Sequence, residues 1–256
     1  MGEDYQDGVG PIEEKQPGLV GVRLSGKQPA RMMRRAVLFD LDGTLTDPKV
    51  GITRSIQHAL VSLDQPAPDA NDLTWCIGPP LHESFRTLLN STDEGLIARA
   101  ISIYRERFSE VGLYENELID GIPQLLDRLQ RAELELFVAT SKPSIFARKI
   151  VTHFRIDRFF GEVYGAELDG SLSDKANLIA HLCGRQALTC DDRVAMIGDR
   201  HHDITGAIAN DIHAIGVTFG YGTREELVSA GAHVIANTVP ELEIWLNDYF
   251  GSSARS

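Results

Sequence analysis

Short apolar runs recur along most of the chain, and charged or turn-forming residues separate them. The first run covers residues 36–39 and follows two arginines. Comparable runs lie at 134–139, 193–197 and 214–217, and a weaker one lies at 161–165. Runs of this length are typical of strands that are buried on both faces of a parallel sheet. We therefore predict a parallel sheet that contains these five segments.

Helical spacing of apolar residues fills the segments between the later runs. The expected helices cover residues 124–131, 144–153, 175–183, a segment that ends at 210, 225–230 and 239–250. Strands that alternate with helices along the chain predict the α/β class. The fold expected from this alternation is a doubly wound parallel sheet.

Between the first two strands the chain follows a different pattern. No segment between Lys49 and Asn116 has a clear strand pattern. The helices expected in this region are 51–63, 69–76, 81–89 and 93–111. We expect residues 48–117 to form a helical block inserted into a core domain made of 32–47 and 118–256. Residues 1–31 mix Gly, Pro and charges of both signs, and we expect them to form a disordered extension.

Composition and charge restrict the classes of partner. The chain has 256 residues, of which 43% are hydrophobic and 24% are charged, as in soluble globular proteins. Its net charge of -12 argues against a nucleic-acid polymer or an anionic membrane as the main partner. Three widely spaced cysteines without a CxxC pair predict reduced thiols in a cytoplasmic protein. No apolar run approaches the roughly 18 residues of a membrane span.

Four aspartates are expected at the carboxyl ends of two strands. Asp40 and Asp42 follow the first apolar run, and Asp199 and Asp203 follow the run at 193–197. Open α/β sheets bind ligands at such strand ends. Two carboxylates about 4 Å apart repel by about 4 kcal/mol at an effective dielectric constant of about 20, so a group of them requires a cation. Oxygen ligands favour Mg²⁺ over zinc, although Asp40 and Asp42 alone could also form an ordinary turn.

The other predicted strand and helix ends supply groups that suit a phosphate. Thr140 offers a hydroxyl and Ser141 a backbone N–H group at a helix entrance. Lys175, near the start of a helix, could supply a cation to a phosphate or to a nucleophile. Acidic metal ligands, a hydroxyl and a lysine together predict the transfer of a phosphoryl group, whose charge must be neutralised and whose oxygens must be aligned.

These residues, in this order, resemble the motifs of the haloacid-dehalogenase-like phosphatase superfamily. The resemblance spans residues 36 to about 246 and implies a Rossmann-like core with a small inserted α-helical cap domain. Such a cap closes over the site and excludes water. The matching residues are Asp40-Leu41-Asp42-Gly43-Thr44, Thr140, Lys175 and Gly198-Asp199 with Asp203.

The resemblance also implies a role for each residue. Asp40 would be the nucleophile that forms an aspartyl-phosphate, and Asp42 the general acid and then the base. Thr140 would bind the phosphoryl group, and Lys175 would orient the nucleophile and the phosphate. The implied Mg²⁺ ligands are Asp40, Asp199 and the backbone carbonyl of Asp42, with Asp203 in support through water or through contacts with the ligands.

Several stretches are most similar to the phosphoglycolate-phosphatase-like group, and especially to its bacterial 5′-nucleotidase branch. The implied substrate is a small phosphate monoester, either a nucleoside 5′-monophosphate or phosphoglycolate, and the implied assembly is a monomer or a homodimer. Neither composition nor spacing distinguishes the two substrates. The similar stretches are Leu45-Thr46-Asp47-Pro48, Ile77-Gly78-Pro79-Pro80-Leu81, Thr140-Ser141-Lys142-Pro143, Gly198-Asp199-Arg200 and Gly220-Tyr221-Gly222.

Other functions on the same or a related fold compete with a phosphatase. Asp42 argues against a dehalogenase, which needs no second carboxylate. The lack of a lysine between Val50 and Ile119 argues against a phosphonatase. Receiver-type signalling modules are shorter and have no helical insertion. A phosphomutase and a catalytically silent phosphate-binding or signalling protein stay as alternatives.

The sequence leaves the role of several further residues open. Lys142 could touch the substrate or be solvated. His201 and His202 lie between two acidic groups, but imidazole suits zinc better than Mg²⁺. The long helix at 93–111 carries three candidates for a substrate contact, which are Tyr104, Arg105 and Arg107.

Overall fold

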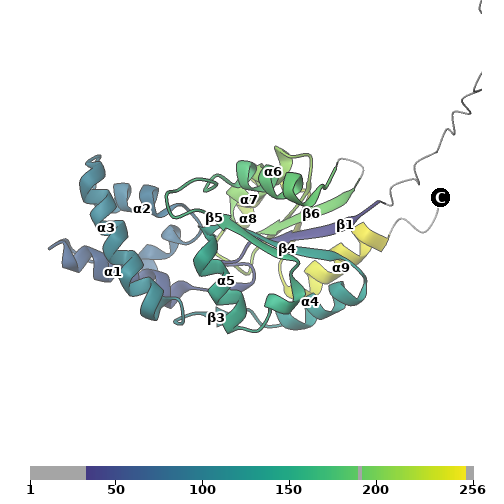
Figure 1. The fold of residues 1–256 in the computed structure, drawn as a ribbon, viewed down its shortest axis with the longest axis horizontal. Helices are drawn as coiled ribbons and strands as arrows, with labels where there is room; N and C mark the ends of the chain where they lie inside the picture. The colour runs from purple at the N-terminus through teal and green to yellow at the C-terminus, as the bar shows by residue number, and fades with distance from the viewer. Residues whose placement is uncertain (1–32, 190–191, 252–256) are drawn as a thin grey trace, which may run out of the picture. The chain divides into compact units, whose positions relative to one another are not determined.

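The structure, a computed structural model, describes residues 33–189 and 192–251. Within them, six strands form one parallel sheet, which confirms the predicted α/β doubly wound fold (Figure 1). The expected disordered extension and Cys190 lie outside the described residues. In spatial order the strands are β5 (Glu162–Ala166), β4 (Glu135–Pro143), β1 (Arg35–Phe39), β6 (Arg193–Gly198), β7 (His213–Val217) and β8 (Val234–Ala236).

Strand β1 lies in the middle of the sheet, where the strand order reverses. The chain runs from β1 through β4 to β5 on one side, and then crosses to β6, β7 and β8 on the other. Phe39 is in register with Val138 of β4 and with Ile197 of β6. The residues that follow these three therefore emerge at the same edge of the sheet, where doubly wound folds bind ligands.

Two helical layers cover the sheet because the side chains of β1 alternate between its faces. Val37 and Phe39 belong to one apolar cluster, and Ala36 and Leu38 belong to the other. The first cluster is covered by α4 (Ile122–Arg131), α5 (Ser144–His153) and α9 (Val239–Gly251), and the second by α6 (Lys175–Gln186), α7 (His201–Ile208) and α8 (Arg224–Ser229) (Figure 1).

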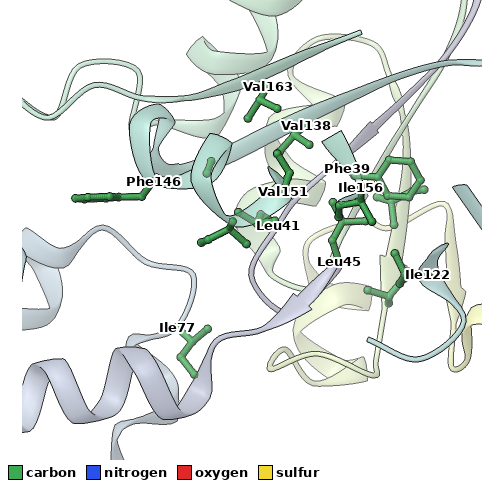
Figure 2. Packing of buried hydrophobic residues seen from close by; sticks show 14 of the residues in the cluster. Phe39, Leu41, Leu45, Ile77, Ile122, Val138, Phe146, Val151, Ile156 and Val163 are labelled. Carbon is green, nitrogen blue, oxygen red and sulfur yellow. The ribbon is translucent and has the colours of Figure 1, made fainter. Parts of the chain in front are cut away.

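The first cluster extends from the sheet into the inserted helices. Val138 and Val163 are register partners in adjacent strands, and Val151 of α5 belongs to the same cluster (Figure 2). Phe146, also in α5, points away from them (Figure 2). Its ring packs edge-on against Phe108 of the insertion, with 5.6 Å between the ring centroids. The cap and the core therefore share apolar contacts.

Along the chain, two short strands that pair in an antiparallel ribbon flank the inserted cap. In space, the cap lies beyond the carboxyl end of β1 (Figure 1). Strand β2 (Thr46–Asp47) leads into it, and β3 (Glu117–Leu118) leads out of it. The domain boundaries at 48 and 117 stay a prediction. The cap elements are α1 (Lys49–Ser62), η1 (Ala70–Cys76), α2 (Leu81–Leu88), α3 (Glu94–Arg107) and η2 (Phe108–Gly112).

Some local expectations differ from the structure. The segment at 69–76 forms a 3₁₀ helix, not an α-helix, and the helix expected at 93–111 changes to a π-helix at Phe108. Strands β2, β3 and β8 have two or three residues each, too few for an apolar pattern to be visible. No helix in the described ranges is long and apolar enough to cross a bilayer.

Candidate active site

Asp40 lies at the centre of a buried ionic cluster. It follows β1 directly and is 5% exposed. The ammonium group of Lys175, the first residue of α6, donates a hydrogen bond of 3.0 Å to Asp40 Oδ1 and one of 2.9 Å to the carbonyl oxygen of Ala139. The same Nζ lies 2.7 Å from Asp203 Oδ1. The structure therefore brings three of the predicted site residues together.

The charges around Lys175 stabilise its protonated form. Burial alone would lower the pKa of Lys175, but the carboxylates of Asp203 and Asp40 outweigh it and raise the pKa above its ordinary value. Burial raises the pKa of Asp203, and Lys175 opposes that rise. Lys175 therefore supplies a permanent positive charge beside Asp40.

Asp199 completes the acidic group. It follows β6 and is fully buried, and its Oδ2 accepts a hydrogen bond of 2.7 Å from the backbone N–H of Tyr221. Gly43 has a φ of 82°, and a side chain there would place its Cβ 2.3 Å from Asp199 Oδ2. The backbone can thus approach Asp199 closely because position 43 is a glycine.

Three of the carboxylates fit a divalent cation. Asp40, Asp199 and Asp203 each offer an oxygen atom, and these atoms lie within 4.8 Å of one another. Asp199 Oδ1 is buried and has no hydrogen-bond partner among the described residues. Burial raises the pKa of Asp199 well above its ordinary value, and the charges of Asp203 and Asp40 add to this. An oxygen-preferring cation would reduce the repulsion between the carboxylates and would give Asp199 Oδ1 a partner.

The carboxylate of Asp42 lies outside this group and pairs with a different lysine. Its Oδ2 lies 2.7 Å from Nζ of Lys142, and both side chains are buried. Burial raises the pKa of Asp42, and the charge of Lys142 opposes that rise. Of the two alternatives left open for Lys142, the solvated lysine is therefore wrong. The metal contact expected from the Asp42 carbonyl stays a prediction.

Thr140 and Ser141 lie at the end of β4, at the same edge of the sheet. Thr140 is buried, and its hydroxyl oxygen accepts a hydrogen bond of 3.2 Å from the backbone N–H of Lys142. The hydroxyl of Ser141 donates to the carbonyl oxygen of Ser173. Thr140 therefore lies in the strand next to Asp40, as its position after an apolar run indicates. Its contact with a phosphate stays a prediction.

A cavity of about 450 Å³ adjoins Asp42 and Lys142 between the core and the cap. Arg105 of α3 lines it, and its Nε is buried without a hydrogen-bond partner among the described residues. Most of the remaining wall is apolar, and it includes the rings of Phe108 and Phe146. The cavity thus has a mainly apolar wall that also carries charged side chains, which are Asp42, Lys142, Arg105, Glu167 and Asp169.

Other open candidates have structural partners. Arg107 lies 2.9 Å from Glu115 and donates a hydrogen bond to Ser55. His201 Nδ1 lies 2.8 Å from Glu226. Among the described residues, the group that could hold a metal consists of aspartates, and neither His201 nor His202 belongs to it. Arg105 and Tyr104 are the members of the predicted trio that line the cavity.

Two contacts near the site join stretches that the resemblance singles out, but the sequence does not show which residues pair. Arg200 donates a hydrogen bond of 2.6 Å from Nη1 to the carbonyl oxygen of Ile77 in the cap. The hydroxyl of Tyr221 donates to Asp47, which belongs to β2. Both join residues more than a hundred positions apart, so only the fold brings them together.

A model of the haloacid dehalogenase-like hydrolases matches residues 37–217, which carry all six predicted site residues. The chain belongs to this family. The resemblance inferred from the aspartate, threonine and lysine motifs is therefore confirmed. The group around Asp40 lies within the matched residues and is the candidate active site.

Known relatives carry more than one functional name. A 5′-nucleotidase from Pseudomonas aeruginosa is 49% identical over 191 residues, or 75% of this chain and 86% of the relative. The tyrosine-protein kinase PtkA from Mycobacterium tuberculosis is 40% identical over 210 residues, or 80% of this chain and 70% of the relative. The crystal structure of a predicted phosphatase from Clostridium acetobutylicum has a TM-score of 0.81 and 41% identity, and covers 85% of this chain and 100% of its own.

Proposed function

We propose that this protein is a Mg²⁺-dependent phosphatase that hydrolyses small phosphate monoesters through an aspartyl-phosphate on Asp40. The observation that carries the proposal is the surroundings of Asp40, whose carboxylate contacts the ammonium group of Lys175 and lies within 4.8 Å of the carboxylates of Asp199 and Asp203. A carboxylate that is fixed between a cation and a metal site can attack a phosphorus atom without losing its orientation. The cytoplasmic location and the monomeric or homodimeric state stay predictions from the sequence.

The carboxylates of Asp40, Asp199 and Asp203 would hold Mg²⁺. When bound, the ion would neutralise the charge of the phosphate oxygens. The unpartnered Oδ1 of Asp199 and the all-oxygen donor set support this assignment. Lys175 would keep its contact with Asp40 and prevent the carboxylate from turning away from the substrate.

The reaction would have two steps. In the first, a carboxylate oxygen of Asp40 forms a bond to phosphorus while the ester P–O bond breaks, and Asp42 donates a proton to the leaving oxygen. In the second, water attacks phosphorus, Asp42 takes a proton from that water, and the bond between phosphorus and Asp40 breaks. The raised pKa of Asp42, which follows from its burial, supports a carboxyl group that can hold the first proton.

The cavity favours a nucleoside 5′-monophosphate over phosphoglycolate. Pockets of a few hundred Å³ with a mainly apolar wall suit ligands of drug size, and this cavity has about 450 Å³. The rings of Phe108 and Phe146 could pack against a base, and the guanidinium group of Arg105 could bind its oxygen atoms or stack on it. Phosphoglycolate would leave most of this volume unfilled.

A phosphate-release assay tests the proposal. The purified chain is incubated with nucleoside 5′-monophosphates, phosphoglycolate and sugar phosphates, with Mg²⁺ or with EDTA. We expect release with Mg²⁺ that EDTA abolishes, and a loss of roughly 10³-fold or more in Asp40→Asn because the amide cannot act as the nucleophile. The proposal fails if no ester is hydrolysed, or if Asp40→Asn retains full activity.

The relative named tyrosine-protein kinase supports a second candidate, in which a tyrosine hydroxyl accepts the phosphoryl group instead of water. The predicted alternative of a phosphomutase also replaces water by a hydroxyl acceptor. Incubation with a nucleoside triphosphate and a tyrosine-containing peptide tests the second candidate. Phosphotyrosine in the peptide would favour that candidate, whereas phosphate release from the monoesters of the assay above, without phosphotyrosine, would favour the phosphatase.

A further inference from the structure

The lysine that pairs with Asp42 has no role in the two reaction steps described above. We propose that Lys142 is a positioning residue for the leaving-group proton, and that its ammonium group holds the Asp42 carboxylate in the orientation that protonates the leaving oxygen. This inference rests on the proposed function, in which Asp42 is the general acid.

The first support is the way in which the two oxygens of Asp42 differ. Oδ2 lies 2.7 Å from Lys142 Nζ, and the lysine side chain is 6% exposed. Oδ1 is buried without a hydrogen-bond partner among the described residues. Asp42 also lines the cavity. Lys142 therefore holds one oxygen and leaves the other without a protein partner among the described residues.

The second support is an irregularity of β4 that directs Lys142 to this position. Thr140 pairs with Gly165 of β5, but the next pair is Pro143 with Ala166, so Ser141 and Lys142 are extra residues in β4. Bulges of this kind change the direction of a side chain and are frequent beside active sites. A Cβ at position 165 would lie 2.5 Å from the carbonyl oxygen of Lys142, so the bulge requires a glycine there.

The third support is a contact with the cap. Nζ of Lys142 lies 4.5 Å from the centroid of the Phe108 ring, in the geometry of a cation–π interaction. Phe108 belongs to η2, and its ring is stacked on Tyr104 at 5.3 Å. The ammonium group is therefore enclosed between a carboxylate of the core and a ring of the cap. The orientation of Asp42 then depends on whether the cap covers the site.

A leaving-group comparison separates this role from phosphate binding and from simple stabilisation. p-Nitrophenyl phosphate releases a stable phenolate and needs no proton from Asp42, whereas adenosine 5′-monophosphate releases an alkoxide that does. The parameter kcat/KM reports on the steps up to departure of the leaving group. Lys142→Met keeps the length of the side chain and removes its charge. The matched control is Lys149→Met, at an exposed lysine of α5.

For Lys142→Met we expect kcat/KM to fall roughly 10- to 100-fold for adenosine 5′-monophosphate, since a misplaced general acid loses most of its effect. For p-nitrophenyl phosphate we expect a change of less than about threefold, because no proton is required. Lys142→Arg should restore part of the loss, and Lys149→Met should behave as the wild type. Equal losses for both substrates would overturn the inference, as would a wild-type profile.

Phe108→Leu tests the same inference if Lys142→Met does not fold. It keeps apolar volume and removes the ring face, so we expect a smaller loss that affects ribose 5-phosphate, an alkyl ester with no base to stack on the ring, and spares p-nitrophenyl phosphate. An equal effect on both esters would contradict a role through Asp42. A wild-type protein that hydrolyses neither ester with Mg²⁺ would instead contradict the proposed function itself.

Discussion

Asp199 is the residue whose environment depends most on a bound cation. It is fully buried, it is repelled by Asp203 and Asp40, and one of its oxygens has no hydrogen-bond partner among the described residues. Its ionised form is therefore unfavourable in the metal-free fold. The same arrangement makes the site ready to bind a divalent ion.

Asp199→Asn should separate stability from activity. The amide keeps an acceptor for the N–H of Tyr221 and removes the repelled charge. We expect the Tm of the metal-free protein to rise by about 2–4 °C, which corresponds to roughly 1 kcal/mol for a chain of this size. The Mg²⁺ concentration for half-maximal activity should rise roughly tenfold or more, because an amide at this position is a weaker metal ligand than the carboxylate of Asp199. Thermal melts with EDTA and a Mg²⁺ titration of activity measure the two effects.

Asp203→Asn is the matched control because Asp203 has a direct cationic partner. Its Oδ1 lies 2.7 Å from the buried ammonium group of Lys175. Removal of one partner from a buried ion pair destabilises a protein by roughly 3 kcal/mol. The Tm of the metal-free protein should therefore fall. If both variants shift the Tm in the same direction, the account of Asp199 is wrong.

At the scale of elements, the sheet supplies the reactive groups and the cap supplies the cavity. Asp40 and Asp199 follow β1 and β6, and Thr140 lies near the end of β4. Because both β4 and β6 pair with β1, this pairing fixes the relative positions of the three residues. Helix α3 carries Arg105 to the wall of the cavity. Substrate preference should therefore depend on α3 more than on the strands.

Arg105→Ala should weaken substrate binding with little effect on stability. Its Nε has no protein partner among the described residues, so its removal breaks no hydrogen bond from that atom. We expect KM for adenosine 5′-monophosphate to rise roughly tenfold, which is typical for the loss of a charged hydrogen bond. Arg99→Ala, at an exposed position of the same helix, should leave KM unchanged. Steady-state kinetics with both variants measure this, and equal KM values for both would contradict a substrate contact.

The sequence predicts best those elements that are buried along their whole length, because their residues form an uninterrupted apolar run. The run at 36–39 is apolar throughout and forms β1, fully buried from Ala36 onward. The bulge of β4 could not be predicted, because it requires Gly165 on the neighbouring strand. The pair of Lys142 and Asp42 is likewise visible only after folding, since a hundred residues separate its members.

At the scale of the whole molecule, local charge differs from net charge. The chain carries a formal net charge of -12, and Lys142, Lys175 and Arg105 bring three cations to the active site and its cavity. Two of these cations are buried against aspartates. Because the site also holds the carboxylates of Asp199 and Asp203, a bound divalent cation would be needed before it attracts an anionic ester, while the overall charge disfavours polyanions.

The most direct test of the account is the detection of a phosphoryl group on Asp40. In Asp42→Asn, the first step should still proceed with p-nitrophenyl phosphate, but the second step should slow because it needs a base. Mg²⁺-loaded Asp42→Asn is mixed with this ester, quenched in acid and digested for peptide mass spectrometry. We predict that the peptide with residue 40 gains the mass of one phosphoryl group, and that the additional change Asp40→Asn abolishes this gain. Nitrophenolate release without phosphate on this peptide, or phosphate on another residue, would contradict the account.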